Sequence, residues 1–244
     1  YGMHWPYRQY TTSRDVLCSP LHQRLVSEGA CFGELAGWER ANWFADAGTK
    51  PKYEYSYGPQ NWYHNQKKEH ETTRERVALY DQTSFAKFDV VGPDAECVLE
   101  RICANSVGRD IGSITYTPWL NERAGIEADV TVTRIAEHAF RVITAPTTRR
   151  KDWHWLLNHI PTGKDCSVSD VTEEWAVLGV MGPQSRTLLS SLTRTNLDNE
   201  SFPFGTGREL EITGITCWAQ RITYVGELGW ELYCPWNAAL ELFC

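Results

Sequence analysis

The sequence lacks any long apolar run. No stretch approaches the roughly 18 consecutive apolar residues that a membrane-spanning helix requires. It also lacks a basic excess, because 24 Lys and Arg stand against 31 Asp and Glu, with a formal net charge of −7. An acidic chain is poorly suited to nucleic acid or an anionic membrane, so we expect neither as a partner. Residues 1–7 show neither the basic nor the apolar region of a secretory signal, and none is expected in this stretch.

Cysteine pairs with metal-site spacing are also missing. The eight cysteines are far apart, form no Cys-x2-Cys pair and show no zinc spacing. We therefore predict no metal site, and reduced thiols in a cytosol-like compartment rather than a disulfide framework.

Three nucleotide and hydrolase motifs are absent. The sequence holds no GxGxxG opening a βαβ unit, no P-loop and no GxSxG elbow. This chain is therefore not expected to bind a dinucleotide by itself.

The composition is that of a globular protein rich in aromatic residues. The 244 residues are 42% hydrophobic, enough for one large domain or a domain and a half. Eleven Trp and eleven Tyr suit a seam between domains, a core or a flat heterocyclic ligand. For most of the Trp residues crowded into 1–62 we favour the seam or core. The chain opens without Met and stops inside an apolar helical pattern at 238–243, so we expect a fragment.

Periodicity predicts an α+β fold with mixed or antiparallel sheets. We expect a helix from Pro20 to Gly29 with Leu21, Leu25 and Val26 on its apolar face. Residues 46–66 read as a linker or loop. The other expected helices are 67–81 (its end leading into a strand), 95–103, 149–159 and 185–192. The expected strands are 31–33, 84–91, 114–117, 130–133, 139–144, 175–181, 214–218 and 219–225.

A strand followed by Gly-Pro and a helix occurs twice. Gly92-Pro93 follows the strand 84–91, and Gly182-Pro183 follows the strand 175–181. This repetition hints at duplicated α+β units, although Gly-Pro before a helix is common. In the first of these helices we expect Cys97, Val98, Leu99, Ile102 and Cys103 to face inward.

The hairpin 114–133 carries the first candidate site residue. Asp129 begins a strand in which Val130 and Val132 alternate with Thr residues. A carboxylate at the start of a half-buried strand needs a cation, a donor or a ligand. The alternative is an Asp that merely ends a turn.

A second polar cluster lies in the segment 221–233. Two glycines three residues apart, Gly226 and Gly229, allow a tight turn that places Glu227 at a bend and Glu231 on the outgoing strand. With Arg221 and Tyr224 they crowd polar groups among apolar neighbours. The alternative is a hairpin with solvated, charged tips.

Several blocks in the right order resemble a known family. The segment 224–232 resembles the YTGE-x-G-x-E signature of the glycine-cleavage aminomethyltransferase, and GELGWEL resembles the folate domain of the sarcosine and dimethylglycine dehydrogenases more closely. Residues 116–129 fit that family's Y-x-x-x-LN-x-x-GG-x-x-x-D stretch. Residues 177–186 match its LGV-x-GPQ-R segment, and residues 19–44 match its link from the flavin half to the folate half.

The resemblance implies an activity and a division of the chain. It places the end of an FAD-oxidoreductase central domain and a linker at 1–48, and an aminomethyltransferase folate-binding domain at 49–244. The complete protein would oxidise an N-methyl amine with FAD bound outside this fragment. The folate domain, packed on the FAD domain, would capture the one-carbon unit on tetrahydrofolate as methylene-tetrahydrofolate, in a bacterial cytoplasm or the mitochondrial matrix.

The resemblance also implies residue roles. Asp129 would sit beside the reactive folate nitrogens as the catalytic carboxylate. Glu227 would hold the pterin amino-pyrimidine edge, Tyr116 and Tyr224 would line the slot, and Glu231 would belong to the same cofactor-binding group.

Two departures from the family pattern are visible. Val225 replaces the Thr of YTGE, and Ala124 replaces the second glycine of the family's turn, which is tolerable if φ there stays below zero. The alternative function is a non-catalytic relative similar to the regulatory subunit of pyruvate dehydrogenase phosphatase. Retention of Asp129, Glu227 and Tyr116 together favours the enzyme.

Overall fold

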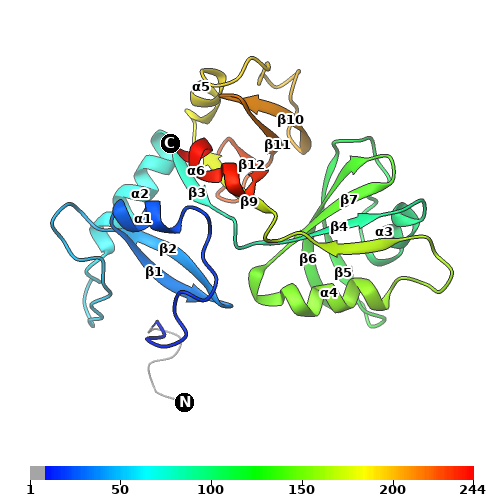
Figure 1. Cartoon of the computed structure of the whole chain (residues 1–244), viewed down its shortest axis with the longest axis horizontal. Helices are drawn as coiled ribbons and strands as arrows, with labels where there is room; N and C mark the ends of the chain where they lie inside the picture. The colour runs from blue at the N-terminus through cyan, green and yellow to red at the C-terminus, as the bar shows by residue number, and fades with distance from the viewer. Residues whose placement is uncertain (1–8) are drawn as a thin grey trace.

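The computed structural model describes residues 9–244, which are built around two five-stranded antiparallel sheets (Figure 1). Sheet C has the order β5 (Ile114–Leu120), β6 (Ile126–Ala136), β7 (Ala139–Thr144), β4 (Ala86–Val91) and β8 (Ser167–Asp170). Its apolar face packs on α3 (Ala95–Ile102) and α4 (Arg149–Asn158), which follows the short η1 (Pro146–Thr148). Phe88, Val130 and Phe140 of the strands meet Leu99 and Leu156 of the helices in this core.

Sheet B has the order β10 (Thr206–Ile212), β11 (Ile215–Arg221), β12 (Gly229–Pro235), β9 (Trp175–Met181) and β3 (Ala78–Asp81). Its core includes residues of α1 (His22–Ser27), α5 (Ser185–Ser190) and α6 (Ala239–Phe243), which follows η2 (Trp236–Ala238). β9 lies inside the sheet and is buried along nearly its whole length, as its uninterrupted apolar run predicted.

A third, smaller sheet lies beside sheet B. Sheet A is the hairpin of β1 (Ala30–Leu35) and β2 (Trp38–Phe44), and α2 (Tyr63–Glu75) contacts β2. Figure 1 shows this hairpin on the side of the molecule away from sheet C. Trp43 is buried and stacks on Trp62 with ring centroids 6.5 Å apart, so these rings pack a seam. Trp5, also in the predicted aromatic cluster, lies outside the described residues.

The two large sheets are built alike, which confirms the duplication that the Gly-Pro repeat indicated. Gly92 follows β4 with φ 142°, and Gly182 follows β9 with φ 132°. A Cβ at Gly92 would lie 2.3 Å from the carbonyl oxygen of Asp165, and one at Gly182 would lie 2.4 Å from that of Arg76. Both turns therefore need glycine, because φ is positive and because the backbone just before a neighbouring strand (β8 or β3) lies too close for a Cβ atom.

The chain crosses between the sheets at two matching segments. β3 belongs to sheet B, yet it leads directly into β4 of sheet C; β8 of sheet C likewise leads into β9 of sheet B. Each crossing begins with the same turn, in which Asp81 accepts from the Thr83 backbone N–H and Asp170 accepts from the Thr172 backbone N–H. A buried hydrogen bond from Gln220 to Thr133 also joins the two sheets.

Several helix predictions need correction. α2 begins at Tyr63 and ends at Glu75, not over 67–81, because polar residues from 63 onward already form an exposed helix. Val26 is 47% exposed and Cys97 is exposed, so neither lies on the inner face we expected. The Ser19-Pro20 start was also early, since α1 begins at His22.

Strand predictions missed β2 and β8 and also failed near the C-terminus. β10 was missed although Glu209, Leu210, Glu211 and Ile212 alternate between exposed and buried positions, and β11 is one continuous strand where two were expected. Ala124 has φ 60°, so the condition under which alanine would be tolerated without cost, a negative φ, is not met. The turn after Asn121 requires a left-handed residue there, and alanine accepts it at a conformational cost.

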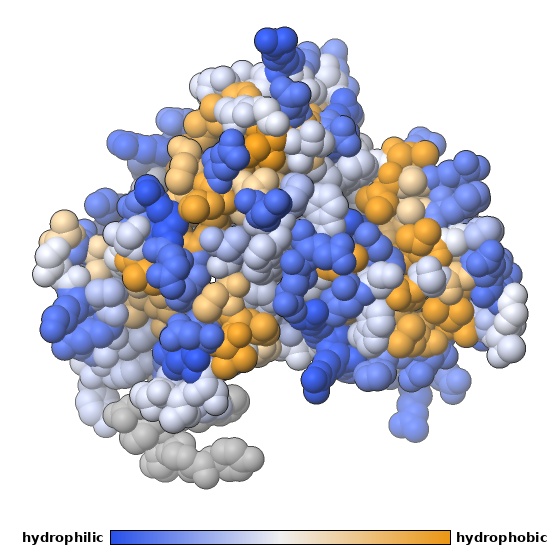
Figure 2. All heavy atoms as spheres, in the orientation of Figure 1, coloured by the Kyte–Doolittle hydropathy of each residue, from blue (hydrophilic) through white to orange (hydrophobic). Residues whose placement is uncertain are grey.

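Two further observations bear on the sequence expectations. All eight cysteines have free thiols. Among residues 9–244, no helix combines the length and apolar character needed to cross a bilayer. Polar residues dominate the face seen in Figure 2, with apolar residues gathered over sheet C and around α6.

Candidate functional site

A cavity of about 280 Å³ lies where the chain crosses between sheets B and C. Four of the five predicted site residues line it: Tyr116, Asp129, Tyr224 and Glu231. Tyr116 and Asp129 come from the β5–β6 hairpin, and Tyr224 and Glu231 come from the loop after β11 and from β12, a segment far from that hairpin in sequence. Cavities between elements that carry a few convergent polar groups are the usual setting of small-molecule sites.

Tyr116 and Asp129 form the polar pair at one wall. Tyr116 lies opposite Thr131 in the β5–β6 ladder and Asp129 lies opposite Pro118, so the two side chains are diagonal neighbours on one face. The Tyr116 hydroxyl donates to Asp129 Oδ2 at 2.7 Å. This hydrogen bond, more than burial, raises the pKa of Tyr116, because a phenolate beside a carboxylate is unfavourable. Both residues are exposed, so the pair is open to a ligand.

Glu231 forms a buried polar pair deeper in the site. Its Oε2 accepts from the Tyr233 hydroxyl at 2.8 Å, and only 8% of the residue is exposed. Burial raises the pKa of Glu231 because the carboxylate loses water, and the nearby Lys87 ammonium opposes this shift. Its burial excludes the alternative of a solvated tip for this residue.

Lys87 itself is fully buried in β4. Its Nζ donates to the carbonyl oxygens of Thr83 and Phe85, each at 2.8 Å. Burial lowers the pKa of Lys87 to about 7, with Arg141 adding to the effect. Since Phe85 lines the cavity, Lys87 fixes the backbone that positions one of its walls.

Aromatic rings separate this cavity from a larger one. Phe85 meets Tyr224 edge to face with ring centroids 5.7 Å apart. Both rings and Gln82 also line a neighbouring cavity of about 600 Å³, which extends toward α2 and sheet A. The two cavities therefore adjoin at Gln82 and these two rings.

Glu227 stands apart from the other predicted residues. It does not line the smaller cavity, and its Oε1 is 2.8 Å from Nη1 of Arg74 on α2. The side chain of Glu227 is 19% exposed and that of Arg74 is 70% exposed. The bend at Gly226 to Gly229 therefore directs the Glu227 carboxylate toward α2.

Sequence reasoning missed polar groups supplied by the crossing segment and the loop after β11. Gln82 Oε1 and Thr223 Oγ1 are buried, line the cavity and have no hydrogen-bond partner among the described residues. Buried polar atoms are normally paired, and Gln82 Oε1 instead faces the backbone of Gly179. The matching Asp-x-Thr turns at 81–83 and 170–172 were the one sequence signal that marked the crossing.

A duplicated sheet-and-helix fold with an aromatic cavity and a Tyr–Asp pair between the sheets defines a ligand-binding α+β domain. Residues 21–244 match the family described as the GCVT N-terminal domain, and the chain belongs to this family. The match begins before residue 49, and the proposed domain boundary there stays a prediction.

The chain is similar in sequence to parts of several longer proteins, over nearly its whole length. It is 44% identical to 4-methylaminobutanoate oxidase (formaldehyde-forming) of Paenarthrobacter nicotinovorans over 99% of this chain and 29% of that protein. It is 30% identical to human mitochondrial sarcosine dehydrogenase over 100% of this chain and 31% of that protein. The mouse pyruvate dehydrogenase phosphatase regulatory subunit is 28% identical over 100% of this chain and 28% of its own length. The chain thus spans about three tenths of these relatives.

A solved structure shares the fold. The glycine cleavage system aminomethyltransferase T from Bartonella henselae superposes with a TM-score of 0.75 and 26% identity, covering 94% of this chain and 56% of that one. The predicted α+β, aminomethyltransferase-like fold is therefore confirmed.

Proposed function

We propose that this chain is the folate-binding part of an FAD-dependent N-methyl amine oxidoreductase of the sarcosine and dimethylglycine dehydrogenase type. Its role would be to hold tetrahydrofolate while the one-carbon unit is captured as methylene-tetrahydrofolate. The observation that carries the proposal is the Tyr116–Asp129 hydrogen bond of 2.7 Å at the wall of an aromatic cavity.

The cavity's chemistry fits a reduced pterin. Phe85 and Tyr224 offer ring surfaces to a flat heterocycle. The side chains of Gln82 and Thr223 line the cavity and supply amide and hydroxyl groups toward its polar edge. The smaller cavity would hold the bicyclic ring, and the adjoining space of about 600 Å³ gives room for the remainder of the molecule.

When bound, tetrahydrofolate supplies the nitrogens that accept the one-carbon unit. Asp129 would stabilise cationic charge beside those nitrogens and accept or steer a proton at its carboxylate oxygens. Tyr116 would keep Oδ2 oriented through its hydroxyl. Glu227 remains a proposed ligand of the pterin amino-pyrimidine edge, where paired N–H donors suit a carboxylate. That role requires it to leave Arg74.

The flavin would be bound by another part of a longer protein. This chain has no dinucleotide fingerprint, and we propose that residues 1–48 end the FAD domain on which the folate domain packs. The amine substrate, and a location in a bacterial cytoplasm or the mitochondrial matrix, belong to the same proposal.

The test is Asp129→Ala in the complete protein, assayed for amine oxidation and for free formaldehyde with tetrahydrofolate present. We expect oxidation to continue while folate-coupled capture is lost, so that formaldehyde accumulates. Asp110→Ala is the matched control, because Asp110 is exposed and its side chain makes no hydrogen bond within residues 9–244. Unchanged formaldehyde release in Asp129→Ala would refute the catalytic role.

The regulatory relative supports a competing function as an interaction protein. A scaffold can persist after its chemistry is lost. Direct titration with tetrahydrofolate separates the two functions: saturable binding that Asp129→Ala or Glu227→Gln alters supports the enzyme, and its absence in the complete protein supports the regulatory alternative.

A further inference from the structure

Three side chains that can ligate a metal converge beside sheet A, outside the cavity of about 280 Å³ that Tyr116 and Asp129 line. Asp15, Cys18 and His22 each offer a ligand atom, and these atoms all lie within 4.8 Å of one another. The spacing Asp-x2-Cys-x3-His brings them together because Cys18 and His22 flank the turn into α1. No Cys-x2-Cys pair marks this cluster, which is why the sequence pattern predicted no metal site.

The three groups make no competing hydrogen bonds. Among residues 9–244, neither the Cys18 thiol nor the His22 ring nor the Asp15 carboxylate takes part in a side-chain hydrogen bond. The His22 side chain is only 10% exposed, and its buried Nδ1 has no partner. An imidazole this buried is normally satisfied at one nitrogen at least.

The distance between His22 and Asp15 suits a shared ion better than a direct bond. His22 Nε2 lies 3.7 Å from Asp15 Oδ1, beyond good hydrogen-bond range. Two ligands at about 2.0–2.1 Å from a tetrahedral Zn²⁺ are about 3.4 Å apart, so a small side-chain rotation completes the geometry. The Asp15 side chain is 73% exposed and free to make it.

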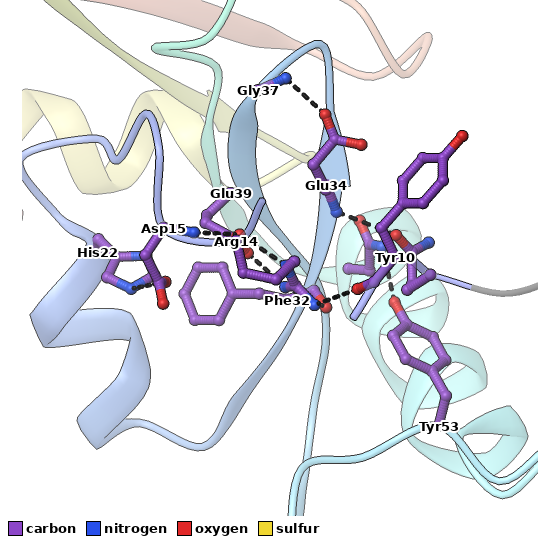
Figure 3. A network of polar contacts seen from close by, with 11 residues as sticks. Tyr10, Arg14, Asp15, His22, Phe32, Glu34, Gly37, Glu39 and Tyr53 are labelled. Atoms are coloured by element: carbon purple, nitrogen blue, oxygen red, sulfur yellow. Dashed lines mark hydrogen bonds and ion pairs between the residues drawn. The ribbon is translucent and has the colours of Figure 1, made fainter. Parts of the chain in front are cut away.

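Surrounding contacts hold the ligands in place. Glu39 is 4% exposed, pairs with the Arg14 guanidinium and accepts from the Asp15 backbone N–H at 2.8 Å (Figure 3). The His22 ring packs on Phe32 with centroids 4.3 Å apart. Because Arg14 and Glu39 neutralise each other, the Asp15 carboxylate leaves the cluster with negative charge for a cation. Such supporting contacts are typical of metal sites.

We propose that Asp15, Cys18 and His22 bind one Zn²⁺, with water as the fourth ligand. Thiolate, imidazole and carboxylate together favour zinc over the hard ions Mg²⁺ and Ca²⁺. Binding replaces the thiol proton of Cys18, which passes to solvent. The ion would fasten residues 13–17 to α1 and sheet A. This proposal is independent of the folate function.

The test is metal binding by the purified chain after treatment with a chelator. We expect one equivalent of Zn²⁺, and on Co²⁺ substitution a thiolate-to-cobalt absorption band. Cys18→Ser should abolish the band and weaken Zn²⁺ affinity at least about tenfold, Asp15→Asn should weaken it less, and Zn²⁺ should raise Tm more in the wild type than in either of these variants.

Cys97→Ser is the matched control, because Cys97 is an exposed thiol outside the cluster. It should keep the stoichiometry, band and affinity of the wild type. Circular dichroism of the metal-free Cys18→Ser and Asp15→Asn variants checks that they are folded. The proposal is overturned if the wild type binds no stoichiometric Zn²⁺, or if Cys18→Ser and Cys97→Ser bind it equally well.

Discussion

Arg74 and Glu227 form an ion pair, with Nη1 of the arginine 2.8 Å from Oε1 of the glutamate. The pair draws toward α2 the carboxylate that the family resemblance assigns to the pterin. Because the arginine side chain is 70% exposed, the pair is weak and can be broken by a ligand.

Arg74→Ala should therefore strengthen tetrahydrofolate binding by the complete protein. An exposed ion pair contributes about 0.2–1 kcal/mol, so its loss predicts a Kd about 1.4- to 5-fold lower. Isothermal titration at low and high salt measures this, and the difference should shrink at high salt. Arg24→Ala, which breaks the remote pair with Glu28, is the control. Weaker binding in Arg74→Ala would mean that the arginine itself contacts folate.

Glu227→Gln should weaken tetrahydrofolate binding by about 1.5–3 kcal/mol, the usual contribution of a hydrogen bond to a charged group. The loss should be larger in the Arg74→Ala background, where the carboxylate has no competing partner. A double-mutant cycle on the measured Kd values isolates this coupling. Equal Kd values for wild type and Glu227→Gln would remove Glu227 from the binding site.

Asp129→Asn should lower the pKa of the Tyr116 hydroxyl toward its ordinary value of 10.0. The hydrogen bond and the negative charge of Asp129 both favour the neutral phenol, so removing the charge makes ionisation easier. Difference absorption spectra of the phenolate band across an alkaline titration report the shift. Tyr116→Phe must lose this titration step, since otherwise the step belongs to another tyrosine.

Lys87 should make stability rise with pH above neutrality. Its folded-state pKa is about 7 against an ordinary 10.5, so between these values the unfolded chain binds a proton that the folded chain does not. The free energy of unfolding therefore increases with pH across that window, and the full penalty is present below it. Urea unfolding at pH 7, 8 and 9 should show a flatter profile for Lys87→Met.

For Lys87→Met, the informative quantity is the change of the free energy of unfolding with pH. The absolute stability is not comparable, because the variant also leaves two carbonyl oxygens without a donor. Lys67→Met, on the exposed face of α2, should retain the wild-type slope. Parallel profiles for Lys87→Met and wild type would show that this ammonium does not titrate in the window.

Ala124→Gly should stabilise the fold by about 0.5–1 kcal/mol. A left-handed alanine costs about 1–2 kcal/mol, and the greater freedom of glycine in the unfolded chain offsets part of the gain. Chemical unfolding of the two proteins measures the difference. Ala128→Gly, on the neighbouring strand β6, should instead destabilise, and stabilisation by both would point to a general effect on the unfolded state.

Much of the fold was readable from local patterns. The alternation along 130–133, the uninterrupted apolar run at 175–181 and the Gly-Pro starts each depend on neighbours in sequence, so their elements were predicted correctly. β10 was missed although Leu210 and Ile212 alternate with the exposed Glu209 and Glu211, because the alternation covers only these four residues. Four of the five predicted site residues line one cavity, although their binding roles stay predictions.

The sequence by itself determined the α+β class, the duplicated strand–Gly-Pro–helix units and the family, because periodicity and motif spacing are properties of short segments. Only the tertiary structure decided that β3 pairs with β9, that Lys87 is buried beneath Phe85, and that Glu227 meets Arg74. Each of these depends on contacts between segments far apart in the chain. Burial and charge pairing arise from such packing, and no local pattern specifies them.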